Sequence, residues 1–287
     1  MLPPKATSGA FAAAHTEQSS NAELWIGTSG YSYPEWIAAG VYPEGLSTAR
    51  MLRHYASKFS TVELNYTWYQ LPKADAVERQ RREAPDGFLF AAKLTRTLTH
   101  QVDGGWKAQA AQYRDGIAPL AQSRQLAAVL AQFPPEFSRS AANRKHLAAL
   151  LDALEGLPVA VEFRHASWNH ERVFRELARR RVTLAAVDEP DLPGLFPPLA
   201  RVTDARLFYA RFHGRNAKGW GSGRMERKFD YSYSDAELSE WIVRYLEPMA
   251  QAALRGVIFF NNHVRGQAVK NAWTLRRLLR ARGWEAR

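Results

Sequence analysis

Eight short apolar segments recur along the chain, each rich in Val, Ile, Phe or Ala. Their apolar residues do not alternate cleanly with polar ones, which is the pattern of strands buried on both faces of a sheet. Such strands are typical of parallel sheets covered by helices. We predict strands at residues 23–29, 61–65, 87–93, 126–133, 157–163, 181–188, 205–213 and 255–262.

Helical periodicity appears in most of the segments between these strands. In residues 47–59, Met51 and Tyr55 lie on one apolar stripe, and Ser47 stands where a helix cap is expected. Residues 189–204 contain four prolines, which leaves little room for a helix there. We predict helices at residues 47–59, 74–84, 107–123, 143–154, 171–180, 234–254 and 267–282.

The alternation of eight strands with helices predicts an α/β fold, a TIM-like (β/α)₈ barrel. The competing fold, a doubly wound open sheet, normally carries a Gly-rich phosphate loop after its first strand. The sequence IGTSG at residues 26–30 is too short for that loop, and no P-loop motif occurs. We therefore assign residues 23–287 to a single barrel domain and expect residues 1–22 to form a flexible N-terminal tail.

Composition and charge narrow the choices further. The chain has no cysteine, so it forms no disulfide, thiolate nucleophile or zinc–thiolate site, and a cytoplasmic location is expected. No apolar run approaches the roughly 18 to 20 residues that span a bilayer, and no secretory signal opens the chain. The formal net charge is +11. Much of the excess positive charge lies in helical segments. It can belong to solvated helix faces or to a surface that binds nucleic acid.

Polar side chains stand at the C-terminal end of every predicted strand. In a (β/α)₈ barrel these ends converge on one face, which carries the active site. Buried polar groups need partners, so a shared polar pocket explains their number better than eight separate accidents do. The side chains are Ser29, Glu63, Asn65, Lys93, His100, Gln132, Glu162, Arg164, His165, Asp188, Arg211, His213, Asn261 and Asn262.

Each of these residues also has a purely structural interpretation. Glu162 can pair with Arg164 or Arg211 as scaffolding, and Asp188 can cap a turn. Trp168 can belong to the core rather than to a ligand platform. The set as a whole is more informative than any one member.

The sequence resembles the YecE-like family, domain of unknown function 72, over nearly all of residues 24–281. The resemblance implies a TIM barrel with a polar pocket at the strand C-termini, but it implies no established reaction. Sequence classifications associate the family loosely with sugar isomerases. The matching stretches are IGTSGYSYPEW, TVELNYTWYQLP, FLFAAKLTRTLTH, LAAVLAQFPPEF, AVEFRHASW, YARFHGR, YSYSDAELSEW and FFNNHVRGQAVKNA.

The resemblance carries over to the strand-end residues given above from Glu63 to Asn262, except Asp188, and adds Trp168 and Asn271. Three departures stand out. Tyr31 replaces a common tryptophan and keeps an aromatic wall. Gln101 and Val102 follow His100 where the family usually has Arg-Leu, which puts an anion contact from this loop in doubt. Residues 263–266 follow the two asparagines and add a cation.

Paired carboxylates with lysine and histidine suit proton transfer. Expected catalytic residues are Glu63, Lys93, Glu162, His165 and His213. Expected substrate-binding residues are Tyr31, Asn65, His100, Gln132, Arg164, Trp168, Asp188, Arg211, Asn261 and Asn262. Lys93 suits the role of electrophile, anion anchor or Schiff-base nucleophile, and arginines grip phosphate or carboxylate.

The leading hypothesis is a metal-independent isomerase, lyase or hydrolase that acts on a small anionic, sugar-like molecule without a cofactor. One alternative is a nucleic-acid-binding or processing protein with a basic, aromatic-lined mouth. Another is a metal-dependent sugar isomerase or endonuclease-like barrel, in which Glu63, Glu162, Asp188 and His213 would bind a divalent metal. Strand eight offers amides instead of an acid, and the many cations fit poorly beside a metal. A ligand sensor without chemistry also stays open. No membrane partner is expected.

Overall fold

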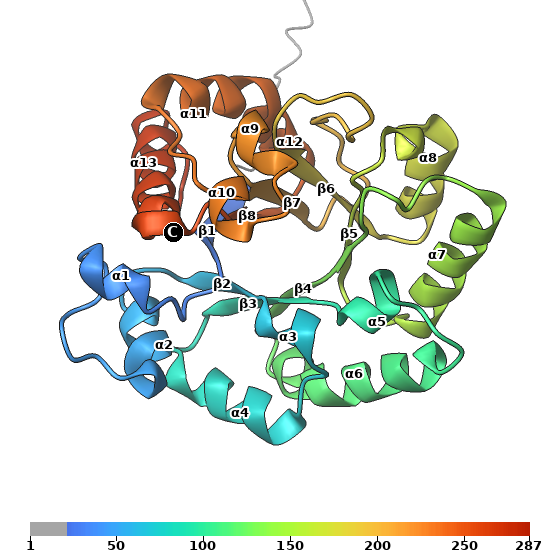
Figure 1. The fold of residues 1–287 in the computed structure, drawn as a ribbon, viewed down its shortest axis with the longest axis horizontal. Coiled ribbons are helices and arrows are strands. Elements are labelled where there is room, and N and C mark those ends of the chain that lie inside the picture. The colour runs from blue at the N-terminus through green and yellow to red at the C-terminus, as the bar shows by residue number, and fades with distance from the viewer. Residues whose placement is uncertain (1–21) are drawn as a thin grey trace, which may run out of the picture.

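Eight parallel strands close into a barrel in the computed structural model, which describes residues 22–287 (Figure 1). Each strand pairs with its neighbours in the chain, and β1 pairs with β8. The predicted TIM-like barrel is therefore confirmed. The tail was predicted over residues 1–22; residues 1–21 lie outside the described residues, and Ala22 is buried. The strands are β1 (Glu23–Ser29), β2 (Thr61–Leu64), β3 (Leu89–Lys93), β4 (Leu126–Gln132), β5 (Val159–Glu162), β6 (Thr183–Asp188), β7 (Phe208–Phe212) and β8 (Arg255–Phe260).

Helices follow the strands and surround the barrel, as Figure 1 shows. Six of the seven predicted helices are present as continuous helices, with ends that differ by a few residues. Ser47 occupies the cap position of α2, but its side chain makes no cap hydrogen bond. The principal helices are α2 (Thr48–Ala56), α4 (Ala74–Glu83), α6 (Trp106–Gln122), α7 (Ala141–Ala153), α8 (Glu171–Arg179), α11 (Asp235–Trp241), α12 (Glu247–Ala252) and α13 (Gln267–Ala281).

Short helical turns occupy several loops at the C-terminal ends of the strands. They were not predicted, because four-residue turns carry too little periodicity to be recognised. The proline-rich stretch after β6 contains no helix, as predicted. The α-helical turns are α1 (Glu35–Ala38), α3 (Tyr66–Tyr69), α5 (Arg96–Thr99), α9 (Ala217–Trp220) and α10 (Met225–Lys228).

One predicted helix is interrupted. Residues 234–254 were expected to form a single helix, but a π-helical turn at Ile242–Leu246 separates α11 from α12. Pro248 lies in the first turn of α12. Proline has no N–H to donate to the preceding turn, so the regular hydrogen-bond ladder cannot continue through it.

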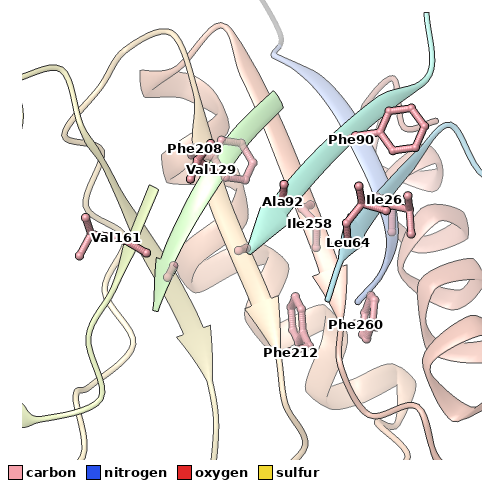
Figure 2. Packing of buried hydrophobic residues seen from close by; sticks show 14 of the residues in the cluster. Ile26, Leu64, Phe90, Ala92, Val129, Val161, Phe208, Phe212, Ile258 and Phe260 are labelled. Carbon is pink, nitrogen blue, oxygen red and sulfur yellow. The ribbon is translucent and has the colours of Figure 1, made fainter. Parts of the chain in front are cut away.

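Two hydrophobic layers hold the barrel. Side chains of alternate strand residues point inward, where Ala91, Ala128, Ala160, Tyr209 and Phe259 fill the interior. The other residues point outward and pack beneath the helices. Figure 2 shows side chains of this outer layer on neighbouring strands, among them Phe90, Val129, Phe212 and Phe260. Among residues 22–287, no helix is long and apolar enough to cross a membrane.

Candidate functional site

Inward-facing charged residues gather at the C-terminal ends of five strands. Every second side chain of a strand points into the barrel, and these residues form the next inward-facing layer above the last apolar one. We call this group the strand-end cluster. Its members are Glu63, Lys93, Glu162, Arg164, Glu189, Arg211 and His213.

Arg211 ties the two glutamates of the cluster together. Its Nη2 donates to Glu63 and its Nη1 to Glu162, each over 2.6 Å. Tyr209, one layer deeper, donates its hydroxyl to Glu63 over 2.6 Å. All four side chains are fully buried. Both carboxylates are thus engaged by strong charge-assisted hydrogen bonds, and each is held in one position.

Arg164 makes a second set of contacts from the loop after β5. Its Nε donates to Glu162 over 2.6 Å, its Nη1 pairs with Glu189, and its Nη2 lies 2.7 Å from His213. Burial alone would raise the pKa of Glu162. The guanidinium groups of Arg164 and Arg211 outweigh that effect, and the pKa lies well below its usual range. Glu162 is therefore a permanent carboxylate at neutral pH.

His213 is a neutral imidazole in this setting. Burial lowers its pKa well below the usual value, and the charges of Arg164 and Arg211 lower it further. Arg164 only donates, so Nε2 of His213 carries the lone pair and Nδ1 carries the proton. Nδ2 of Asn261 lies 3.0 Å from Nδ1, so a proton on Nδ1 requires the Asn261 amide to be turned over with its oxygen toward the ring.

Lys93 is the last residue of β3 and lies on the open side of the cluster. Its Nζ is 5.0 Å from the ring centroid of Trp68. Burial lowers the pKa of Lys93 to about 7, with a further contribution from Arg211. Glu162 and Glu63 oppose this shift without cancelling it. Lys93 therefore loses its proton far more readily than an exposed lysine does.

Glu189 is the cluster residue that sequence analysis missed. It follows β6 directly, and its side chain is only 3% exposed. Burial raises the pKa of Glu189 to about 7 even though Arg164 pairs with it. Its Oε1 has no hydrogen-bond partner among the described residues. A carboxyl group that titrates near neutral pH can both give and take a proton.

The structure places Asp188 on the other face of β6. It accepts hydrogen bonds from Arg215 and from the Tyr233 hydroxyl, the latter over 2.6 Å. It therefore braces the loop after β7 and does not join the cluster. Alternation along β6 explains the difference, since Ala185 points inward and Glu189, four residues on, shares its direction. Counting in steps of two from Ala185 would have selected Glu189.

Several other predicted site residues also lie away from the cluster. His165 caps the short helical turn at Ala166–Trp168. Trp168 is buried in an aromatic stack outside the barrel. Asn262 contacts Asn271 and the backbone of residue 231. The Tyr31 hydroxyl accepts a hydrogen bond from Gln80 of α4. These positions favour structural roles.

The remaining predicted residues border the cluster. Gln132 faces inward at the end of β4 and donates to a neighbouring carbonyl. His100 packs edge-on against Trp68, with ring centroids 5.2 Å apart, and burial together with Lys93 lowers its pKa to about 4. Asn65 has a buried Oδ1 without a partner within residues 22–287.

One half of the cluster is covered and the other half is partly open. The segment of residues 214–230, which carries α9 and α10, lies over the β7–β8 side (Figure 1). Trp220 and Phe229 of this segment pack against His213, and the Arg164 guanidinium lies 5.5 Å from the Trp220 ring centroid. On the β2–β3 side, Lys93 and Trp68 keep partial exposure. Access is therefore from the β2–β3 side.

Polar atoms without partners accumulate around the cluster. In the part of the chain that the structure describes, they include Ser29 Oγ, Asn65 Oδ1, Trp68 Nε1, Glu189 Oε1 and Arg211 Nε. Buried polar groups are nearly always hydrogen-bonded in folded proteins. A group of exceptions on one face of a barrel is typical of a ligand site, where the bound molecule supplies the missing partners.

The four residues of the metal-dependent alternative are not arranged as a metal site. Glu63 and Glu162 are bonded to arginines, and Asp188 points to the opposite face of its strand. Within residues 22–287, no group of three or more His, Asp or Glu side chains is arranged to hold a metal ion.

Two surface grooves lie away from the cluster. A groove of about 630 Å³ runs between α7 and α8, with Leu147 and Leu177 in its lining. The other, of about 680 Å³, lies at the N-terminal ends of the strands.

Comparisons with known proteins agree with this architecture. A family model described as "Protein of unknown function DUF72" matches residues 25–286. The UPF0759 protein YunF of Bacillus subtilis is 28% identical over 271 residues, which cover 89% of this chain and 94% of that protein. The UPF0759 protein YecE of Escherichia coli K12 is 27% identical over 194 residues, 64% of this chain and 65% of that protein.

Solved structures give the same result. A DUF72 family protein from Thermotoga maritima has a TM-score of 0.81 and 34% identity, with 90% of this chain and 99% of that chain covered. A DUF72 family protein from Enterococcus faecalis has a TM-score of 0.81 and 26% identity, with 90% of this chain and 95% of that chain covered.

Proposed function

This chain belongs to the DUF72 family, and from that premise we propose that it is a metal-independent enzyme that performs acid–base chemistry on a small anionic, sugar-like substrate. The single observation that carries the proposal is that the strand-end cluster contains two buried titratable side chains, Lys93 and Glu189. Both groups have a pKa of about 7 and lie around the same guanidinium, that of Arg164. A general acid or base works best when its pKa is near the working pH.

The geometry supports roles that differ from those expected from sequence. Glu63 and Glu162 are held by Arg211, so they support the site rather than transfer protons. Proton transfer falls to Lys93 and Glu189 instead. Titratable groups whose pKa is shifted strongly by burial and by neighbouring charges are often found in the active sites of enzymes.

Charge and shape support an anionic, sugar-like substrate. The carboxyl groups of Glu63 and Glu162 are hydrogen-bonded to the guanidinium groups of Arg164 and Arg211. Lys93 gains a proton readily beside an anion, because an opposite charge raises the pKa of a lysine. The amides of Asn65 and Gln132 border the cluster and suit sugar hydroxyl groups, and the Trp68 ring suits the face of a sugar.

Solvent exchange at carbon tests the proposal whichever reaction follows the proton transfer. Sugar phosphates and sugar acids are incubated with the protein in D₂O, and loss of C–H signals is followed by NMR. We expect at least one compound to exchange deuterium catalytically. Glu189→Gln and Lys93→Met should each reduce the exchange rate by about 100-fold or more, the usual contribution of a general acid or base.

The exposed lysine over Trp106 provides a matched control. Lys107 also lies near a tryptophan ring, 5.9 Å from its centroid, but outside the cluster. Lys107→Met should retain the wild-type exchange rate. Full exchange activity in both Glu189→Gln and Lys93→Met would contradict the assignment, and a complete lack of exchange across the panel would contradict the acid–base function.

A nucleic-acid function is the second candidate, because the net charge is +11 and tryptophans lie beside cations at the barrel mouth. Lys228 is 4.0 Å from the Trp220 ring centroid, and Arg96 is 5.9 Å from that of Trp68. Aromatic rings with flanking cations are typical of single-strand binding surfaces. The arginines within the cluster are already paired with carboxylates, which favours the enzyme.

A further inference from the structure

We propose that Nζ of Lys93 attacks the carbonyl carbon of an open-chain aldose or ketose and holds the substrate as a Schiff base. This inference rests on the proposed function and deepens it, since it makes the substrate an anionic sugar that carries a free aldehyde or ketone. It also gives the chemistry a covalent intermediate, which separates it from simple proton shuttling.

The backbone presents Lys93 in a fixed position. The carbonyl oxygen of Lys93 accepts hydrogen bonds from the Thr67 hydroxyl over 2.6 Å and from the Tyr113 hydroxyl over 3.2 Å. Thr67 and Tyr113 are both buried. The end of β3 is therefore anchored from two sides, and the lysine stem leaves it toward the cluster. A nucleophile must be placed in this way before it can react efficiently.

The amine itself is left available. Nζ of Lys93 lies 5.0 Å from the ring centroid of Trp68. Among residues 22–287, no carboxylate oxygen lies within 4.0 Å of Nζ, although Glu63 and Glu162 are in the same cluster. Arg211 occupies those carboxylates instead. A lysine locked in a salt bridge could not act as a nucleophile, and Lys93 is not locked in one.

The electrostatic setting supports the same role. Burial and the charge of Arg211 lower the pKa of Lys93 to about 7, so a large fraction is the reactive free amine at neutral pH. An exposed lysine with the ordinary pKa of about 10.4 is almost entirely protonated at that pH. Desolvation beside another cation is a known way of activating a lysine for Schiff-base chemistry.

The chemical balance needs no added reagent. The lone pair of Nζ forms the C–N bond, and the carbonyl π pair moves to oxygen. The nitrogen then gives up one proton and the oxygen takes one, which gives a neutral carbinolamine. A second proton on that hydroxyl lets it leave as water, and the nitrogen lone pair forms the C=N bond. Glu189 is suited to deliver these protons, since its pKa is about 7. Hydrolysis reverses every step, with no oxidant or reductant consumed.

Two other lysines are the relevant competitors. Lys228 lies 4.0 Å from the Trp220 ring centroid, and burial lowers its pKa to about 8. It belongs to α10 in the covering segment, and it lies beside Glu189 and Arg164 rather than at the end of a strand. Lys107 is exposed near Trp106. The sequence has nine lysines in total, so amine labelling gives a short list of possible sites.

Reductive trapping tests the inference directly. The full chain is incubated with glyceraldehyde 3-phosphate and sodium cyanoborohydride, and modified peptides are identified by mass spectrometry. We expect one dominant adduct, at Lys93, whose rate of formation rises with pH around a midpoint near 7. The adduct should disappear in Lys93→Met and remain in Lys107→Met. Labelling of Lys93 no faster than Lys107, or labelling only at Lys228, would overturn the inference.

The two proposals can fail separately. Deuterium exchange that depends on Lys93 and Glu189, without trapping at Lys93, would leave the acid–base function and remove the Schiff base. Trapping at Lys93 without exchange of any compound would leave a reactive lysine and remove the proposed enzyme function. Because labelling is mapped on the wild-type protein, misfolding of a variant cannot produce or remove the trapping result.

Discussion

At the scale of single residues, the cluster contains two side chains that lower the stability of the fold. Lys93 and Glu189 both have a pKa moved toward their neutral form, which means that the folded state disfavours their charges. Evolved sites often retain such groups because activity requires them. Glu162 shows the opposite behaviour, since its arginine partners favour its charge.

Replacement of Lys93 by methionine should therefore stabilise the protein while it abolishes activity. We expect the free energy of unfolding to rise by about 1–2 kcal/mol at pH 7, the range of ordinary stabilising changes. The pKa of Lys93 is about 7 when folded and 10.5 unfolded. In wild type, the unfolded state binds the extra proton between these values, so the penalty fades as pH rises. The gain should be largest below pH 7 and absent near pH 10.5.

Urea denaturation of both proteins at several pH values measures this difference. Lys107→Met is the control, because the Lys107 side chain is exposed. It should leave the unfolding free energy within about 0.5 kcal/mol of wild type. A destabilised Lys93→Met protein, or a gain that grows with pH, would show that Lys93 is charged and well accommodated in the fold.

The sequence predicted which polar residues lie at the strand ends, but not which of them face the barrel interior or which of them pair. The pattern correctly indicated which strand ends carry Glu63, Lys93, Glu162 and Arg211. It selected Asp188 rather than Glu189, because the end of β6 was placed correctly while the facing direction was not considered. The pairing of Arg211 with both glutamates could not be predicted, since it depends on how β2, β5 and β7 meet across the barrel.

At the scale of elements, the strands could be predicted from sequence, but the shortest helices could not. All eight strands were predicted from runs of apolar residues, because strands covered on both sides need apolar side chains along their whole length. α9 and α10 were not predicted, because each has only four residues. These two short helices belong to the segment that covers the site. The barrel could therefore be predicted from sequence, but the covered side of the site could not.

Gly116 provides a test of helix packing. It lies inside α6, and an added Cβ would stand 2.1 Å from the backbone oxygen of Pro72. A backbone oxygen cannot turn aside as a long side chain can. We expect Gly116→Ala to destabilise the protein by about 1–3 kcal/mol, as overpacking does, despite the better helix propensity of alanine. Chemical denaturation measures the change.

Gly104 is the matched control, since an added Cβ there meets nothing within 4 Å. Gly104→Ala should leave the unfolding free energy within about 0.5 kcal/mol of wild type. Equal stability of the two variants would mean that the loop at Pro72 moves away at little cost.

At the scale of the whole molecule, the charge of +11 acts separately from the site. A basic surface attracts polyanions over long distances whatever the cluster does. We expect a single-stranded oligonucleotide to bind weakly, with Kd of about 10⁻⁴ to 10⁻⁶ M at physiological salt, and to lose affinity steeply as salt rises. A fluorescence anisotropy titration at several salt concentrations measures both properties.

Lys93→Met distinguishes general charge from a nucleic-acid site. The variant removes one partly buried amine and should leave oligonucleotide affinity and its salt dependence nearly unchanged. Trp220→Phe, which keeps an aromatic ring in the covering segment, should behave in the same way. A large loss of affinity in Lys93→Met would favour the nucleic-acid function over the enzyme.

The cover formed by residues 214–230 has a consequence for the pace of the reaction. Trp220 and Phe229 lie over His213 and Arg164, so a substrate that enters beside Lys93 must displace part of this segment to reach Glu189. Such displacements take microseconds to milliseconds in proteins. The time between entry and reaction would then be set by a loop that carries none of the reacting groups. Relatives with a different loop here would work at a different speed on the same chemistry.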